Sequence, residues 1–229
     1  MGVARGFDVL RAVTAAPRLG PPSATRDRLR RQALDLARAE KLVDAAYSYR
    51  FVPLEETPAA PWLRAGGERL HAPRLLPESG QLTALACAVC TLGTRLEHRV
   101  TSLFAERRVS LAMALDDLGN ELLFAASRRV QDRMLADASR RGLTMAGELR
   151  AGDPGLALEA QGAVLRLARG ELADVRLTES LMMHPRKSAS MVLGVGIDLP
   201  PALWSRCDDC PQSDTCKVVA RASAALSEA

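Results

Sequence analysis

The clearest hydrophobic pattern in the chain is a repeat of apolar residues at three- and four-residue steps between Ser110 and Arg141. This spacing places the apolar side chains on one face of an α-helix, and Gly142 directly after it is a typical C-terminal stop. The pattern therefore predicts one long helix. The members of the repeat are Leu111, Leu115, Leu118, Leu122, Ala126, Val130 and Met134.

Shorter helices are predicted on both sides of the long one. Ser23 or Thr25 can cap the start of a helix that runs to about Ala46. Residues 95–106 and 158–167 also have helical spacing of their apolar positions. These segments have the length and polarity of helices that bury one face only.

Strand patterns alternate with these helices. Residues 47–54 alternate between polar and apolar side chains. Leu82–Thr91 is a continuous apolar run that fits a buried strand, and periodicity alone leaves a helix open as the alternative. Gly66 and Gly67 indicate a hairpin or short strands up to Leu76. The other predicted strands are Leu143–Arg150, Thr178–Met183 and Ala189–Ile197, the last two flanking a turn at Pro185.

The order of these elements predicts the fold class. Strands and helices interleave without a regular βαβ rhythm, which favours an α+β fold with a twisted mixed or antiparallel sheet packed by helices. A length of 229 residues suits a single domain with extensions. We expect a basic N-terminal arm and helix over residues 1–46, a central domain over 47–199, and a cysteine-containing tail over 200–229.

Composition narrows the possible partners. Lys and Arg number 31 against 27 Asp and Glu, so the net charge is only +4, and the basic residues concentrate in the N-terminal arm. Aromatic residues are 3% of the chain, which argues against a surface that stacks bases, so nucleic acid is an unlikely partner. No apolar run approaches the roughly 18–20 residues of a membrane span, and the N-terminus lacks the apolar core of a signal peptide. We therefore expect a cytoplasmic protein.

The five cysteines form two clusters that suggest different chemistry. Cys207, Cys210 and Cys216 have the spacing of a zinc or iron–sulfur site, with Cys87, Cys90 or His184 as a candidate fourth ligand. A redox-active or structural thiol pair, or no special role, are the alternatives. If Leu82–Thr91 is a strand, the pair within it points to opposite faces and cannot share one ion, and buried cysteine is a common small hydrophobe.

Several segments resemble one known family when they are taken in order. A Thr-Leu-Gly turn precedes the long helix with its Asp and small-residue step, and an Arg followed by Pro-Gly comes next. In this order they resemble the activation (reactivation) domain of cobalamin-dependent methionine synthase over roughly residues 47–197. This chain has Leu156 where the family has a Tyr after Pro-Gly. The segments are Thr91–Glu97, Leu115–Gly119, Glu148–Gly155, Glu179–Ser188 and Ser190–Gly194.

The resemblance implies a function in the reductive reactivation of a corrinoid methyltransferase, as one part of a split methionine synthase. Such a domain binds S-adenosylmethionine, docks on a corrinoid-binding protein and receives an electron from a flavodoxin- or ferredoxin-like donor. Corrinoid-binding domains carry Asp-x-His-x-x-Gly, and none of His71, His98 and His184 has an Asp two positions earlier. Cobalamin would therefore be held by a partner chain.

The resemblance also implies site residues. Arg150 and Gly155 would hold S-adenosylmethionine, since an arginine binds a carboxylate through two parallel hydrogen bonds. Two other classes of function remain open: an adaptor that docks a corrinoid protein without a ligand, and a metal or iron–sulfur redox protein that uses the C-terminal cysteines. The remaining candidate residues are Pro185, Lys187 and Ser188 to close the site, and Asp116 or Glu121 to meet the amino group.

Overall fold

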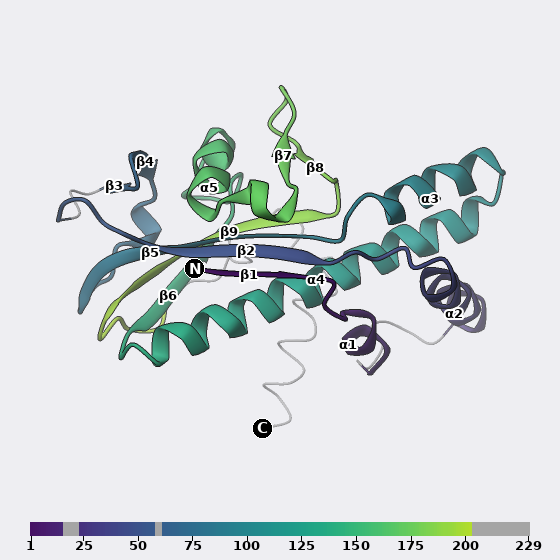
Figure 1. The fold of residues 1–229 in the computed structure, drawn as a ribbon, viewed down its shortest axis with the longest axis horizontal. Coiled ribbons are helices and arrows are strands. Elements are labelled where there is room, and N and C mark those ends of the chain that lie inside the picture. Colours follow the sequence, from purple (N-terminus) through teal and green to yellow (C-terminus); the bar gives the residue numbers. More distant parts are fainter. Residues whose placement is uncertain (16–22, 58–60, 203–229) are drawn as a thin grey trace.

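The computed structural model describes residues 1–15, 23–57 and 61–202 (Figure 1). Its centre is a five-stranded sheet in which every neighbouring pair of strands is antiparallel. This confirms the α+β class and selects the antiparallel form of the sheet. In spatial order the strands are β1 (Gly2–Arg5), β2 (Ala46–Pro53), β5 (Gln81–Thr91), β9 (Ser188–Ile197) and β6 (Thr144–Leu149).

Helices cover the two faces of this sheet unequally (Figure 1). On one face α4 (Val109–Ser139) crosses the strands, and α1 (Leu10–Ala15), α2 (Ala24–Ala39) and α3 (Arg95–Ala105) pack against it. The other face carries α5 (Gln161–Ala168). The remaining elements are the hairpins β3 (Trp62–Ala65)–β4 (Glu68–His71) and β7 (Arg176–Leu177)–β8 (Met183–His184), and the 3₁₀ turns η1 (Pro73–Leu75), η2 (Leu158–Ala160) and η3 (Gly170–Ala173).

The central strand β5 contributes to both hydrophobic layers because successive side chains of a strand point to opposite faces. Ala86, Ala88 and Cys90 belong to the layer under α4, whereas Cys87 and Val89 belong to the layer under α5. All five are fully buried. Burial on both faces explains why this segment has a continuous apolar sequence instead of an alternating one.

A row of aromatic side chains supports the C-terminal half of α4. The row consists of Phe7, just after β1, and of Tyr47, Tyr49 and Phe51 in β2, with successive ring centroids 5.3, 6.0 and 6.0 Å apart. The hydroxyl of Tyr49 donates a hydrogen bond to Asp137 of α4. The row therefore uses half of the chain's eight aromatic residues to fix one helix on the sheet.

The N-terminal segment begins and ends differently from the pattern prediction. Ser23 caps α2 as predicted, since its hydroxyl accepts a hydrogen bond from the backbone of Arg26. The helix ends at Ala39, however, and does not continue to Ala46, which already belongs to β2. It ends because Lys41 adopts a left-handed conformation with φ of 50°, which reverses the chain.

The predicted strand Thr178–Met183 is wrong. The structure has two-residue strands on either side of a turn, in which the backbone N–H of Thr178 donates to the carbonyl of Met182 at 2.9 Å. The Thr178 side chain accepts from the Met182 N–H, and Leu181 has a φ of 61°. Local side-chain hydrogen bonds of this kind compete with strand formation. No helix in the described ranges is long and apolar enough to cross a membrane.

Candidate functional site

The first half of β9 extends beyond its neighbour β6. On one side β9 pairs with β5 from Ser188 onward, whereas its pairing with β6 starts only at Val192, opposite Leu149. Residues 188–191 therefore have no partner strand on that side within the described chain. Candidate residues from the sequence lie around both ends of this stretch.

Lys187 forms the first polar cluster, at the start of β9. It is 9% exposed, and its Nζ lies 2.8 Å from Asp116 Oδ1 and donates to Asn120 Oδ1 at 2.7 Å. The two oxygen ligands are four residues apart in α4, so they lie on the same face of the helix. Gly119 leaves room for the lysine stem, because a Cβ there would lie 3.1 Å from Lys187 Cε. The geometry anchors β9 to α4.

Ser188 faces the opposite side of the sheet from Lys187, as neighbouring strand residues must. Its hydroxyl lies 2.8 Å from Thr91 Oγ1 and 2.6 Å from the carbonyl of Pro185. The preceding loop is also bound to α3, since Glu97 accepts a hydrogen bond from the Arg186 N–H at 2.7 Å. Pro185 and Ser188 are buried and fix this loop, whereas Lys187 faces α4.

Arg150 forms a second polar cluster at the end of β6. Its Nε donates to Glu148 Oε1 at 3.0 Å, and the other oxygen of Glu148 accepts from Gln131 of α4. The backbone N–H of Arg150 donates to Asp153, which shapes the turn that follows. Nη2 of Arg150 also lies 3.0 Å from Glu148 Oε1, so Glu148 engages Nε and Nη2 and leaves the other N–H donors among the five of the guanidinium.

Gly155 completes that turn with a φ of 94°, a conformation that favours glycine. A Cβ at this position would lie 3.0 Å from Cδ of Arg74. The next residue, Leu156, is buried in the layer under α5. The position where the resembling family has a Tyr is therefore a core position in this chain.

The two polar clusters are well separated along α4. Asn120 and Gln131 are 11 residues apart, which corresponds to about 16 Å of helix. A carboxylate and an ammonium bound to one carbon cannot span this distance. The spacing therefore favours contacts of Arg150 and Asp116 with two separate groups of one ligand, and their roles in binding stay predictions.

Glu121 is not brought to either cluster. It accepts hydrogen bonds from Arg30 of α2, with a closest distance of 2.7 Å. Five residues separate it from Asp116, a rotation of about 140° around the helix. Of the two acidic candidates on α4, only Asp116 lies beside β9.

Four residues that lie at or between the two polar clusters, on α4 and β6, were not predicted from the sequence. Asn120 and Phe124 follow Asp116 at helical steps, and Gln131 continues the same face of α4. Phe124 is 56% exposed and lies between the clusters. Glu148 is two residues before Arg150, so strand alternation places both on one face. Counting helical steps from Asp116 and strand steps from Arg150 would therefore have found these residues.

Cys87 and Cys90 do not form a shared site. They are fully buried on opposite faces of β5, and Cys90 Sγ lies 3.5 Å from the Ser127 hydroxyl. Burial raises the pKa of the Cys87 thiol to about 12 and also raises that of Cys90. Within the described residues, no group of three or more His, Cys, Asp or Glu side chains is placed to hold a metal ion. Cys207, Cys210 and Cys216 lie outside those residues.

Comparison with known proteins bears on the fold. No protein-family model matches the sequence, and a search of curated proteins found no match. Among solved structures, the chain is similar to a crystal structure of the MetH reactivation domain bound to AdoHcy. The match covers 90% of this chain and 81% of that chain, with a TM-score of 0.61 and 13% sequence identity. The chain therefore has the fold of the MetH reactivation domain.

Proposed function

We propose that this protein binds S-adenosylmethionine and serves in the reductive reactivation of a corrinoid methyltransferase whose cobalamin is held by another chain. The observation that carries the proposal is the fold shared over 90% of the chain with a reactivation domain that was solved with AdoHcy. AdoHcy is S-adenosylmethionine without the methyl group on sulfur. A site for one therefore suits the adenosyl and amino-acid groups of the other.

The ligand site in this proposal is the surface of α4 between the two polar clusters. Arg150 binds the methionyl carboxylate through donors that Glu148 does not use. Asp116 remains 43% exposed while it binds Lys187, so its carboxylate and the amide of Asn120 can accept and donate hydrogen bonds at the adenosine end. This placement agrees with the separation of the two clusters, because the methionyl group and the base are at opposite ends of an extended ligand.

Phe124 has the position of a contact for the centre of the ligand. It lies on the same face of α4 as Asn120 and Gln131, and its ring is largely exposed. An aromatic ring attracts a nearby cation through its π-face, and the sulfonium of S-adenosylmethionine is a cation. The ring therefore favours the sulfonium form of the ligand over the neutral thioether of AdoHcy.

The contribution of this chain to the reaction is to hold and orient the methyl donor at an accessible surface. When held by its own protein, the corrinoid would supply a cobalt centre that the electron donor can reduce and that can take the methyl group, which leaves AdoHcy. Lys187, Pro185 and Ser188 keep the start of β9 in place through bonds to α4 and β5. In the proposed cytoplasmic system the corrinoid protein is part of a split methionine synthase, and a flavodoxin- or ferredoxin-like protein donates the electron.

Calorimetric titration with S-adenosylmethionine tests the proposal. We expect saturable binding that Arg150→Ala weakens by about tenfold or more, the effect of losing a charge-assisted hydrogen bond. Phe124→Ala should weaken S-adenosylmethionine more than AdoHcy. Arg28→Ala, an exposed arginine on α2, is the matched control and should bind like the original chain. Absence of saturable binding would contradict the proposal.

One observation favours an adaptor without a ligand as the second candidate. Leu156 is buried where the resembling family has a Tyr, so this chain lacks that polar side chain at the turn. An adaptor would show no affinity for S-adenosylmethionine and would still bind a corrinoid protein. The titration above therefore separates the two functions.

A further inference from the structure

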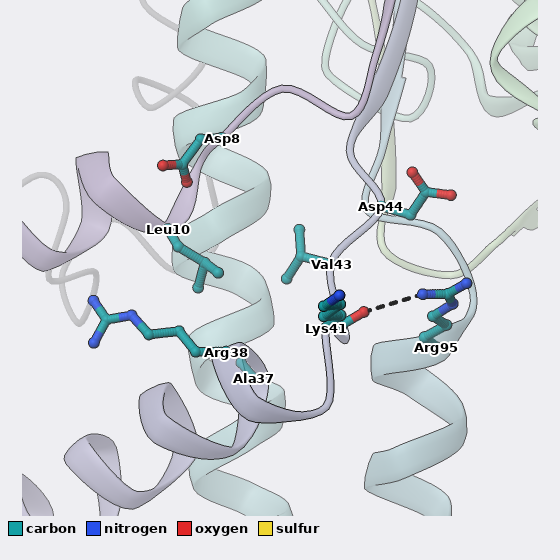
Figure 2. A pocket seen from close by; sticks show the side chains of 8 residues that line it. All are labelled: Asp8, Leu10, Ala37, Arg38, Lys41, Val43, Asp44 and Arg95. Atoms are coloured by element: carbon teal, nitrogen blue, oxygen red, sulfur yellow. Dashed lines mark hydrogen bonds between the residues drawn. The ribbon is translucent and has the colours of Figure 1, made fainter.

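A second surface, away from the residues proposed to hold S-adenosylmethionine, has the features of a binding site. α1, the end of α2, the segment before β2 and the start of α3 surround a hollow of about 530 Å³ (Figure 2). A neighbouring hollow of about 430 Å³ shares Asp8, Leu10 and Arg38 with it. The first is lined by Asp8, Leu10, Ala37, Arg38, Lys41, Val43, Asp44 and Arg95, and the second adds Arg11 and Thr14.

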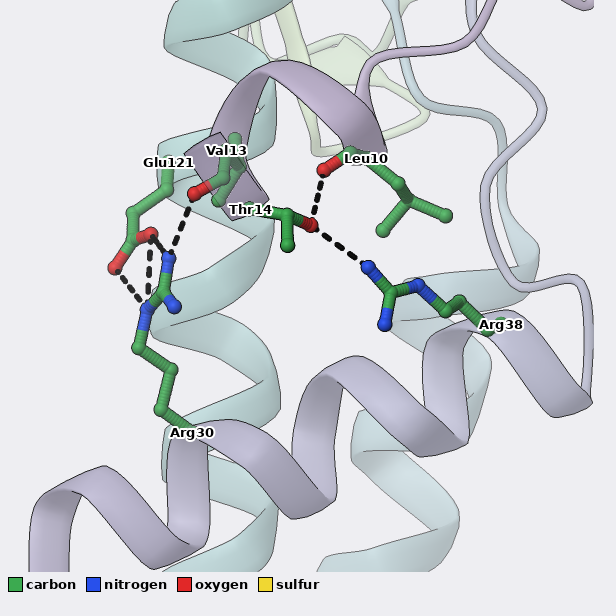
Figure 3. Close-up of polar contacts among 6 residues, drawn as sticks. All are labelled: Leu10, Val13, Thr14, Arg30, Arg38 and Glu121. Carbon is green, nitrogen blue, oxygen red and sulfur yellow. Dashed lines mark hydrogen bonds and ion pairs between the residues drawn. The ribbon is translucent and has the colours of Figure 1, made fainter. Parts of the chain in front are cut away.

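Four cations around these hollows have no carboxylate partner among the described residues. Arg38 donates to the Thr14 hydroxyl at 2.8 Å (Figure 3), and Arg95 donates to the Lys41 carbonyl at 3.4 Å (Figure 2). No bond of the Arg11 or Lys41 side chain to another described residue is seen. Arg38 and Arg95 thus bind neutral oxygens, whereas the side chains of Arg11 and Lys41 have no partner among the described residues.

Two nearby arginines, one on α2 and one on α3, are instead paired with carboxylates. Arg30 of α2 pairs with Glu121 at 2.7 Å (Figure 3), and Arg99 of α3 pairs with Glu40 at 3.0 Å. Glu40 directly precedes Lys41 in the chain and binds away from the hollow. Arg11, Arg38, Lys41 and Arg95 therefore face a concave part of the surface without a carboxylate ion pair among the described residues.

The lining contains two carboxylates against four cations, which leaves an excess of two positive charges. Asp8 accepts a hydrogen bond from the Arg11 N–H at 3.2 Å and so caps the start of α1. The hydrogen bond to Asp174 is the main cause that raises the pKa of Arg5, and Asp44 adds a smaller electrostatic contribution. Figure 2 shows Asp8 and Asp44 at opposite upper edges of the hollow, with Val43 between them and Lys41 below Val43.

We propose that this hollow binds a small phosphate monoester with an apolar organic group. A phosphate dianion matches an excess of arginine and lysine donors, and arginine forms two parallel hydrogen bonds to it. Leu10, Val43 and Ala37 provide an apolar wall for the organic part. The volume is within the range of small-molecule sites.

Lys41 allows a test that separates binding from folding. It is the left-handed residue that ends α2, a position where glycine has no steric cost. Lys41→Gly therefore removes one cation of the hollow without removing a bond that holds the fold. Arg107 ends α3 in the same conformation, with a φ of 59°, and it does not line either hollow. Arg107→Gly is thus a control with the same change in charge and backbone.

The experiment is calorimetric titration of the full chain with phenyl phosphate, inorganic phosphate and a hexaglutamate peptide, at constant ionic strength. We expect saturable binding of phenyl phosphate, weaker binding of inorganic phosphate, and losses of about tenfold in Lys41→Gly and Arg38→Ala. Arg107→Gly and Arg31→Ala should bind like the original chain, and Lys41→Gly should not lower Tm.

Three results would overturn the proposal. The first is no saturable binding of phenyl phosphate. The second is an equal loss in all four variants, which indicates a general charge effect. The third is binding of hexaglutamate at least as tight as that of phenyl phosphate, which indicates an acidic protein segment as the partner.

Discussion

Two lysines of the chain lie in opposite environments: Lys187 packs between β9 and α4, and Lys41 lies at the hollow beside α1. Lys187 is buried and has two oxygen partners on α4. Lys41 is exposed, has no side-chain partner among the described residues and adopts a backbone conformation that glycine prefers. A buried charge requires partners, whereas an exposed cation is hydrated by water. The difference separates charges that hold the fold from charges that are free to bind a ligand.

The largest expected effect comes from removing the buried cation. Lys187→Ala should lower the free energy of unfolding by about 3 kcal/mol, because it breaks a buried pair and removes the stem that packs over Gly119. Asp116 stays partly hydrated, which keeps the loss at the lower end of the range for buried pairs. Urea unfolding measures it.

Lys187→Met is the control for this variant, since it keeps the aliphatic stem and removes only the charge. It should lose less stability than Lys187→Ala. A change below about 0.5 kcal/mol in the alanine variant is typical of an exposed surface site. Such a result would remove the contrast between the two lysines.

The next effect is a loss of stability at alkaline pH through Tyr49. Burial and the hydrogen bond to Asp137 raise the pKa of this phenol from 10.0 to about 12. The unfolded chain therefore releases the proton first, so stability that is present below pH 10 is lost as the pH rises to about 12. Two pKa units correspond to about 2 to 3 kcal/mol.

Tyr49→Phe isolates this share of the pH dependence. The buried thiols of Cys87 and Cys90 also have raised pKa values and add to the alkaline loss in both proteins. The comparison is therefore the difference between the two unfolding curves from pH 10 to 12. Parallel curves would show that Tyr49 keeps an ordinary pKa.

The parts of the fold that sequence patterns predicted are those with strong local periodicity. α4 and β5 each bury long regular stretches, so local spacing located both of them, although it left a helix open as the alternative for β5. β1 was missed because four residues are too few for a pattern, and its place in the sheet depends on pairing with β2, more than 40 residues away. The turn after Thr178 was missed because its hydrogen bonds involve a side chain.

The sequence predicted which residues belong to the candidate site, but it did not predict how they are arranged in space. Lys187 and Asp116 were both named, but nothing in the sequence joins residues 71 positions apart. Helical phase separates Asp116 from Glu121, although only the packing of α4 decides which of them faces β9. The distance from Asp116 to Arg150 likewise depends on how α4 crosses the sheet.

At the hollow, the expected effect on stability is smaller and of opposite sign. Lys41→Gly should raise the free energy of unfolding by about 0.5 to 1 kcal/mol, because a side chain in the left-handed region costs about 1 to 2 kcal/mol. Loss of a cation near the end of α2 offsets part of this gain. Urea unfolding of this variant and of Arg107→Gly should give gains of similar size. A destabilised Lys41→Gly would mean that the lysine holds the fold after all.

The smallest expected change in stability, that of Arg38→Ala, is the strictest test of the difference between charges that hold the fold and charges that bind a ligand. Arg38→Ala removes an exposed guanidinium and one hydrogen bond to Thr14, so the free energy of unfolding should change by less than about 0.5 kcal/mol. Its effect on phenyl phosphate binding should nevertheless be about tenfold. Urea unfolding and calorimetry on the same preparation measure both quantities. A loss of stability near that of Lys187→Ala, with no change in binding, would instead show that Arg38 joins α1 to α2 as a structural bridge. Binding lost at nearly constant stability would show that the charges of the hollow are not required by the fold.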